Sequence, residues 1–83
     1  MKDDKYKDDK YYELLEKVTN RVVSNWSWED LSDLGNKMKN NVKNEMKSAK
    51  NILLSSGHDL EDVNDFYDEV NRKVSAWISN FSL

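Results

Sequence analysis

The sequence has no cysteine and no proline, and only two of its 83 residues are glycine. Without cysteine the chain can form neither a disulfide nor a thiolate metal site, and small domains in oxidising compartments usually depend on such cross-links. Loops and tight turns draw on proline and glycine, so their scarcity argues against a fold of many strands. Together these absences favour an all-helical protein of the cytoplasm.

Long apolar segments are also missing. The longest apolar run is Ile52-Leu53-Leu54, whereas a membrane-spanning helix needs about 20 apolar residues. The charged start of the chain is not followed by the apolar segment of a secretory signal. A chain of this length forms one domain, and such a domain buries only about 60% of its unfolded surface. We therefore expect a soluble single domain with a thin core and no contact with a membrane.

Apolar residues recur at spacings of three and four in three segments, which predicts three amphipathic helices. The first helix is expected over about 8–24 and follows a flexible, charged arm at 1–7. The second is expected over 28–55. A break at Gly35 stays open, because a glycine inside a helix costs about 1 kcal/mol relative to alanine. The third helix is expected over about 60–81.

Short polar segments separate these helices and contain signals for helix ends. Ser27 and Asp30 resemble a capping box. Gly57 suits the left-handed residue after a helix, and Asp59 suits an N-cap. Because the connections are short, neighbouring helices run antiparallel. The predicted fold is therefore all-α, an antiparallel three-helix bundle that forms one domain over 8–83.

The third segment has the clearest apolar stripe, flanked by Phe66 and Ile78. Its members are Leu60, Val63, Tyr67, Val70, Val74, Trp77 and Phe81. In the bundle, the turn that carries Trp26 and Trp28 lies at the same end as Trp77, which predicts an aromatic cluster there. Residues two apart point in different directions, so we expect at least one of Trp26 and Trp28 to be exposed to a partner.

Residues suited to catalysis are scarce. His58 is the sole histidine, and it lies in the connection before the third helix, beside Ser56 and Asp59. Neighbouring loop residues cannot generally align these three side chains into a nucleophilic triad. Zinc needs three or four His, Cys or carboxylate ligands, and no glycine-rich phosphate loop is present. We therefore expect neither an enzyme nor a bound cofactor or metal.

The net charge of −3 conceals an uneven distribution. Between Asn36 and Lys50 the chain has five lysines and one acid, Glu45, whereas between Asp59 and Glu69 it has six acids and no base. In an antiparallel pair of helices these two stretches are expected to lie side by side. Each exposed pair of opposite charges would then contribute at most about 1 kcal/mol to stability.

The acidic stretch predicts contact with a protein partner, because an anionic helix face can imitate phosphates in the basic groove of a nucleic-acid enzyme. The predicted partner-binding residues are Glu61, Asp62, Asp65, Asp68, Glu69, Trp26 and Trp28. Small, cysteine-free, acidic proteins rich in lysine and asparagine resemble the regulators and inhibitors that phages and mobile elements carry, including anti-CRISPR and other counter-defence proteins. This resemblance of composition implies an inhibitor in the cytoplasm of a bacterial host.

Two other functions stay open. A stripe on the second helix is the alternative, nucleic-acid-binding surface, and its residues are Lys39, Lys43, Lys47, Lys50, Asn40 and Asn44. The negative net charge and the shortage of arginine argue against that surface. A thin core also gains stability from association, so a structural homo-oligomer is the third hypothesis.

Overall fold

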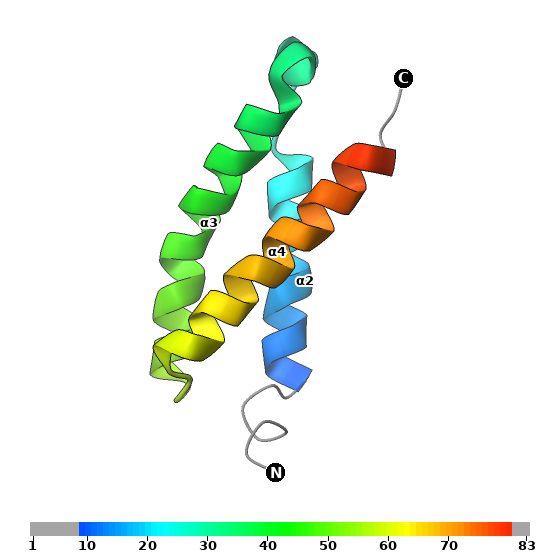
Figure 1. The fold of residues 1–83 in the computed structure, drawn as a ribbon. Coiled ribbons are helices and arrows are strands. Elements are labelled where there is room, and N and C mark those ends of the chain that lie inside the picture. The colour runs from blue at the N-terminus through cyan, green and yellow to red at the C-terminus, as the bar shows by residue number, and fades with distance from the viewer. Residues whose placement is uncertain (1–8, 81–83) are drawn as a thin grey trace.

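The computed structural model describes residues 9–80, and the regular secondary structure of this range is entirely helical. In chain order the elements are α2 (Asp9–Ser24), the short 3-10 helix η1 (Trp28–Asp33), α3 (Leu34–Ser55) and α4 (Leu60–Asn80) (Figure 1). The three long helices confirm the predicted all-α bundle. The predicted arm at 1–7 and Phe81 lie outside the described residues.

The three long helices pack against one another in every pairwise combination. α3 runs antiparallel to α2, and α4 returns antiparallel to α3 while it crosses α2 at an angle (Figure 1). The result is an elongated molecule with extents of 43 × 21 × 17 Å. Its length lies along the helices, so the two ends of the bundle are well separated.

One core runs through the bundle and takes a stripe from each long helix. Its members are Tyr11, Leu15, Val18, Val22, Leu34, Met38, Val42, Met46, Ala49, Leu53, Val63, Phe66, Val70 and Val74. The stripes of α2 and α3 follow the predicted spacing. The stripe of α4 departs from it in two places.

The prediction that Leu60 and Tyr67 belong to the core side of α4 is wrong. Leu60 is 60% exposed and Tyr67 is 37% exposed, whereas Phe66, predicted only as a flanking residue, is completely buried. Leu60 is the first residue of α4, where the bundle ends and no helix covers it. Phe66 packs edge-on against Tyr11, with 5.4 Å between the ring centroids. The phenylalanine ring has no polar atom, so its complete burial breaks no hydrogen bond with water. The tyrosine at the edge of the bundle keeps its hydroxyl in water.

The segment predicted as the second helix is not one continuous α-helix over 28–55, and it is not broken at Gly35 either. A 3-10 helix covers its first six residues, and the α-helix begins at Leu34, so Gly35 lies inside the first turn of α3. The N-cap of α3 is Asp33, whose backbone is not helical and whose Oδ1 accepts a 2.9 Å hydrogen bond from Asn36 Nδ2. Aspartate favours such local bonds over a helix interior. The change of helix type therefore occurs at Asp33.

The turn between α3 and α4 confirms the predicted end signals. Gly57 has a φ of +96°, the left-handed conformation that ends α3. The backbone N–H of His58 donates to the carbonyl of Leu53 at 3.0 Å, which closes the turn. Asp59 then caps α4, because its Oδ1 accepts the backbone N–H of Asp62 at 3.0 Å.

Asn41 is a buried polar residue that the sequence analysis did not single out. Its Nδ2 donates to the carbonyl oxygens of Val22 at 3.1 Å and of Asn25 at 2.7 Å. The last carbonyls of a helix have no partner within the helix, so Asn41 of α3 supplies one at the end of α2. This amide ties the two helices together at a fixed position.

Candidate binding surfaces

The first candidate surface lies at the end of the bundle where η1 meets the C-terminal part of α4. The ring centroids of Trp26 and Trp28 lie 5.4 Å apart, and those of Trp26 and Trp77 lie 6.2 Å apart, both in edge-to-face geometry. The predicted aromatic cluster is therefore confirmed. Trp28 is 74% exposed, which also confirms that at least one of the two neighbouring tryptophans faces solvent. We call these three residues the tryptophan end.

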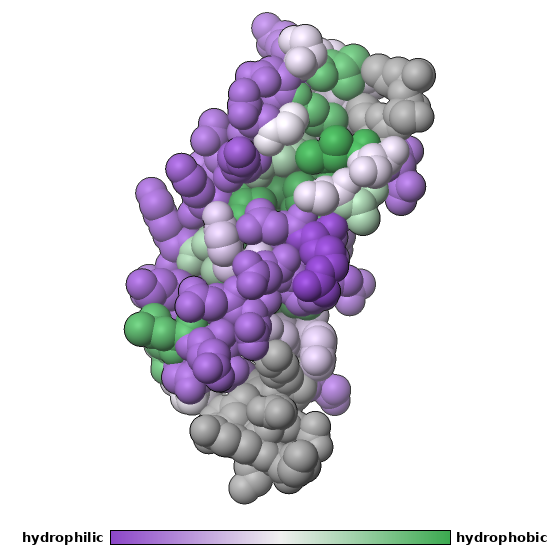
Figure 2. Space-filling model, viewed as in Figure 1, coloured by the Kyte–Doolittle hydropathy of each residue, from purple (hydrophilic) through white to green (hydrophobic). Residues whose placement is uncertain are grey.

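The local backbone presents Trp28 from an ordered turn. Trp28 is the first residue of η1, and the residue before it, Ser27, donates its backbone N–H to Asp30 Oδ2 at 2.8 Å. This bond is half of the capping box that the sequence predicts. A hollow of about 450 Å³ opens beside Trp77 between α2 and α4, with Val23 in its lining. Apolar surface is also visible at this end in Figure 2, in the upper part of the view.

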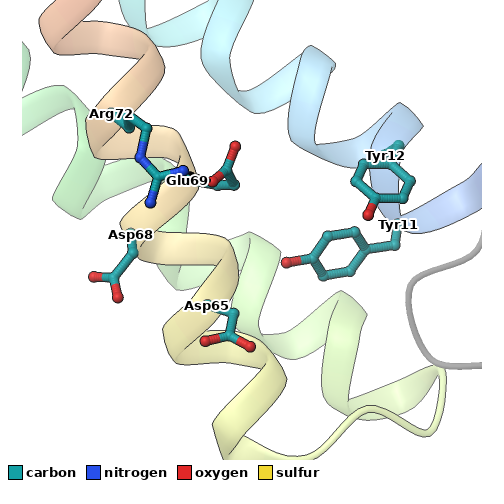
Figure 3. Close-up of a pocket in the computed structure, with 6 residues that line it drawn as sticks. All are labelled: Tyr11, Tyr12, Asp65, Asp68, Glu69 and Arg72. Atoms are coloured by element: carbon teal, nitrogen blue, oxygen red, sulfur yellow. Dashed lines mark hydrogen bonds and ion pairs between the residues drawn. The ribbon is translucent and has the colours of Figure 1, made fainter. Parts of the chain in front are cut away.

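The second candidate surface is the acidic edge of α4, defined by Glu61, Asp62, Asp65, Asp68 and Glu69. Asp65, Asp68 and Glu69 line a hollow of about 400 Å³ together with Tyr11 and Tyr12 of α2 (Figure 3). Glu69 is turned toward the two tyrosines, while Asp68 points away from them (Figure 3). The acidic edge therefore borders α2.

This position corrects the prediction that the acids lie against the lysines of the second helix. Within residues 9–80, no ion pair joins a lysine of α3 to an acid of α4. The one ion pair between long helices in that range joins Arg21 of α2 to Glu45 of α3, at 3.5 Å. Spacing along a helix gives the angle between its residues but not its rotation relative to two neighbours, and here the rotation turns the acids away from α3.

The carboxylates of the acidic edge differ in how they are held. Asp62 has a side chain only 13% exposed, and its Oδ2 lies 3.0 Å from His58 Nδ1. Glu69 accepts a hydrogen bond from Arg72, one turn along α4. Glu61 and Asp68 are exposed, as is Asp65. The structure thus brings all five acids to one side of α4, with Asp62 drawn into the fold.

The two parts of the predicted partner site lie at opposite ends of α4. Glu61 is in the first turn of α4 and Trp77 is in the last, a separation of 16 residues or about 24 Å along the helix axis. Trp26 and Trp28 belong to the end that Trp77 marks. A single small contact cannot include both the tryptophan end and the start of the acidic edge.

The third candidate surface is the lysine face of α3, defined by Lys39, Lys43, Lys47 and Lys50. All four are exposed, and so are the neighbouring Asn40 and Asn44. The structure therefore brings the alternative nucleic-acid-binding residues together on one helix. Asn41, in the middle of the same helix, faces inward instead.

His58 is a packing residue in this structure. Its ring is buried, lies tilted against Tyr11 with 5.6 Å between centroids, and is bonded to Asp62 through Nδ1. Within residues 9–80 no group of three or more His, Cys, Asp or Glu side chains is placed to hold a metal ion. The helices of the same range are also too short or too polar to cross a membrane.

Comparison with protein-family models, with curated proteins and with solved structures found no match.

Proposed function

We propose that this protein is not an enzyme and acts by binding another protein, with Trp28 at the centre of the contact. The observation that carries the proposal is the 74% exposure of Trp28 in an ordered, capped turn. Its ring rests on Trp26, which in turn rests on Trp77. A large aromatic side chain on a rigid support loses little entropy on binding, and tryptophan is enriched among the residues that dominate binding energies.

The acidic edge has a second role in the proposed function, which is to attract a basic partner. Glu61 and Asp68 are exposed on α4, and like charges on one edge attract a basic partner over a distance of several ångströms. Such charges raise the association rate more than they slow dissociation. A basic nucleic-acid enzyme fits this charge, and an inhibitor of that kind, in the cytoplasm of a bacterial host, is the class that the composition resembles.

The proposal is tested with Trp28→Ala and a matched control, Ile52→Ala. Ile52 is an exposed apolar residue on α3, near the other end of the bundle. Tagged protein captures partners from its host, the captured protein is purified, and its affinity is measured by calorimetry. We expect Trp28→Ala to weaken binding by about 30-fold or more, roughly 2 kcal/mol, and Ile52→Ala to change it by less than about threefold.

Equal affinity of Trp28→Ala and the unsubstituted protein would contradict the proposal. Sedimentation of the purified protein gives a further check. If Trp28→Ala converts an oligomer into a monomer, the exposed ring serves self-association, and the homo-oligomer hypothesis replaces the proposed function.

A further inference from the structure

The lysine face of α3 is a cationic surface whose lysines form no ion pair within residues 9–80. α3 contains five lysines and one acid, Glu45, and Arg21 of α2 holds that acid. The positive charge of the lysine face is therefore available to a ligand.

Helical geometry places this face away from α2. Asn41 and Glu45 mark the side of α3 that faces α2, since both bond to residues of that helix. At 3.6 residues per turn, Lys39, Lys43 and Lys50 lie about half a turn around α3 from those two residues. They occupy the edge of α3 on the side of α4.

The side of α4 that faces α3 has neutral residues next to the lysine face. Asp65, Glu69 and Arg72 line the hollow next to α2 and so mark the α2 side of α4. Tyr67 and Asn71 lie on the other side of the helix, toward α3, and Tyr67 is partly exposed. Tyr67 and Asn71 thus lie between the lysine face and the acids on the α2 side of α4, Asp65 and Glu69.

We infer that the lysine face binds the phosphodiester backbone of nucleic acid without sequence preference. Lys39 to Lys50 span about 16 Å along α3, enough for contacts with several successive phosphates. A lysine ammonium binds phosphate as a point charge, and the exposed amides of Asn40 and Asn44 add hydrogen-bond donors at its border. The net charge of −3 does not prevent this, because ligands respond to the local field of a surface.

This inference is independent of the proposed function. It uses α3, whereas the protein contact uses Trp28 and the acidic edge of α4. The competing ligand for a lysine face is an acidic segment of another protein, and the experiment below separates the two.

The test measures fluorescence anisotropy of labelled oligonucleotides of about 20 nucleotides, as single strand and as duplex, at about 50 mM and about 200 mM salt. With about four phosphate contacts, log K should fall against log salt with a slope of about −3. In Lys39→Glu/Lys43→Glu/Lys50→Glu we expect at least a tenfold loss of affinity at the lower salt and a slope near zero.

The matched control is Lys10→Glu/Lys17→Glu/Lys73→Glu, which changes the net charge equally. These three lysines are exposed on α2 and α4, outside the lysine face. We expect the control to keep its affinity within about threefold, since screening limits the effect of charges more than about 10 Å away. Circular dichroism confirms that each variant is folded, and if the glutamate variant is not, Lys39→Gln/Lys43→Gln/Lys50→Gln takes its place.

Three results would overturn the inference. The first is absence of binding by the unsubstituted protein to either oligonucleotide at the lower salt. The second is an equal loss of affinity in both triple variants, which would mean that only the net charge matters. The third is tighter binding of a labelled poly-glutamate peptide than of nucleic acid, which would assign the face to an acidic protein.

Discussion

At the scale of single residues, Asn41 links the second long helix to the end of the first. Its buried Nδ2 donates to two carbonyl oxygens, that of Val22 in the last turn of α2 and that of Asn25 just after the helix ends at Ser24. Because a buried carbonyl without a partner costs more than a hydrogen bond contributes, this amide is a sensitive point in an otherwise apolar interface.

We expect Asn41→Ala to lower the free energy of unfolding by about 2 kcal/mol, since it removes two hydrogen bonds and leaves two carbonyls with poorer partners. Urea denaturation followed by circular dichroism measures the change. Asn40→Ala and Asn44→Ala are the matched controls on the exposed side of α3 and should each cost less than about 0.5 kcal/mol. A similar cost for all three would show that the two bonds of Asn41 do not contribute to stability.

At the scale of elements, the rotation of α4 about its axis decides which aromatic residue supports the core. Phe66 is fully buried against Tyr11, while the next residue, Tyr67, is at the edge. A rotation by one residue would exchange their places. The loss of stability on substituting Phe66, compared with the loss on substituting Tyr67, therefore shows which of the two residues α4 turns into the core.

Phe66→Ala should destabilise the protein by about 3–5 kcal/mol, and Tyr67→Ala by about 1 kcal/mol or less. Thermal melting by circular dichroism compares the two. Since the larger loss approaches the whole stability of a small domain, Phe66→Leu and Tyr67→Leu provide a milder pair with the same expected order. The reverse order in either pair would contradict the observed rotation of α4.

Helix number, helix ends and caps could be predicted because they depend on local signals. The bond between Ser27 and Asp30, the left-handed Gly57 and the cap at Asp59 each involve residues within three positions of one another. The face of α4 depends on a distant neighbour instead. Two stripes with spacings of three and four share Val63, Val70 and Val74, and packing against the other helices, including the contact with Tyr11, selects the one that contains Phe66.

The residues of each candidate surface could be predicted from the sequence, but the positions of the surfaces relative to one another could not. The exposed residues of the acidic edge and of the lysine face follow from periodicity within one helix, and the exposure of one tryptophan follows from the two-residue spacing of Trp26 and Trp28. Their relative placement required the rotations of three helices at once. For this reason the sequence predicted mutual neutralisation of acids and lysines, whereas in the structure the acidic edge borders α2.

At the scale of the whole molecule, the bundle separates three surfaces of different chemistry. The tryptophan end is aromatic, the acidic edge lies between α4 and α2, and the lysine face lies on α3. Because the proposed protein contact and the proposed nucleic-acid contact use different surfaces, we expect the bundle to hold both ligands at once.

We expect the protein contact and the nucleic-acid contact to be energetically independent. Trp28→Ala should change nucleic-acid affinity by less than about twofold, and Lys39→Glu/Lys43→Glu/Lys50→Glu should leave the dissociation rate of the protein partner within about twofold. Combining the substitutions tests this with both binding assays. A coupling above about 1 kcal/mol would show that the two ligands compete or assist each other.

The tryptophan end also determines what optical spectroscopy can detect. All three tryptophans of the chain gather at one end of an elongated bundle. Intrinsic fluorescence excited at the indole band therefore reports on that end alone, while events around Tyr11, Tyr12 and Tyr67 do not alter it directly. The native chain contains its own position-specific probe, and a ligand that changes the emission can be located without any added label.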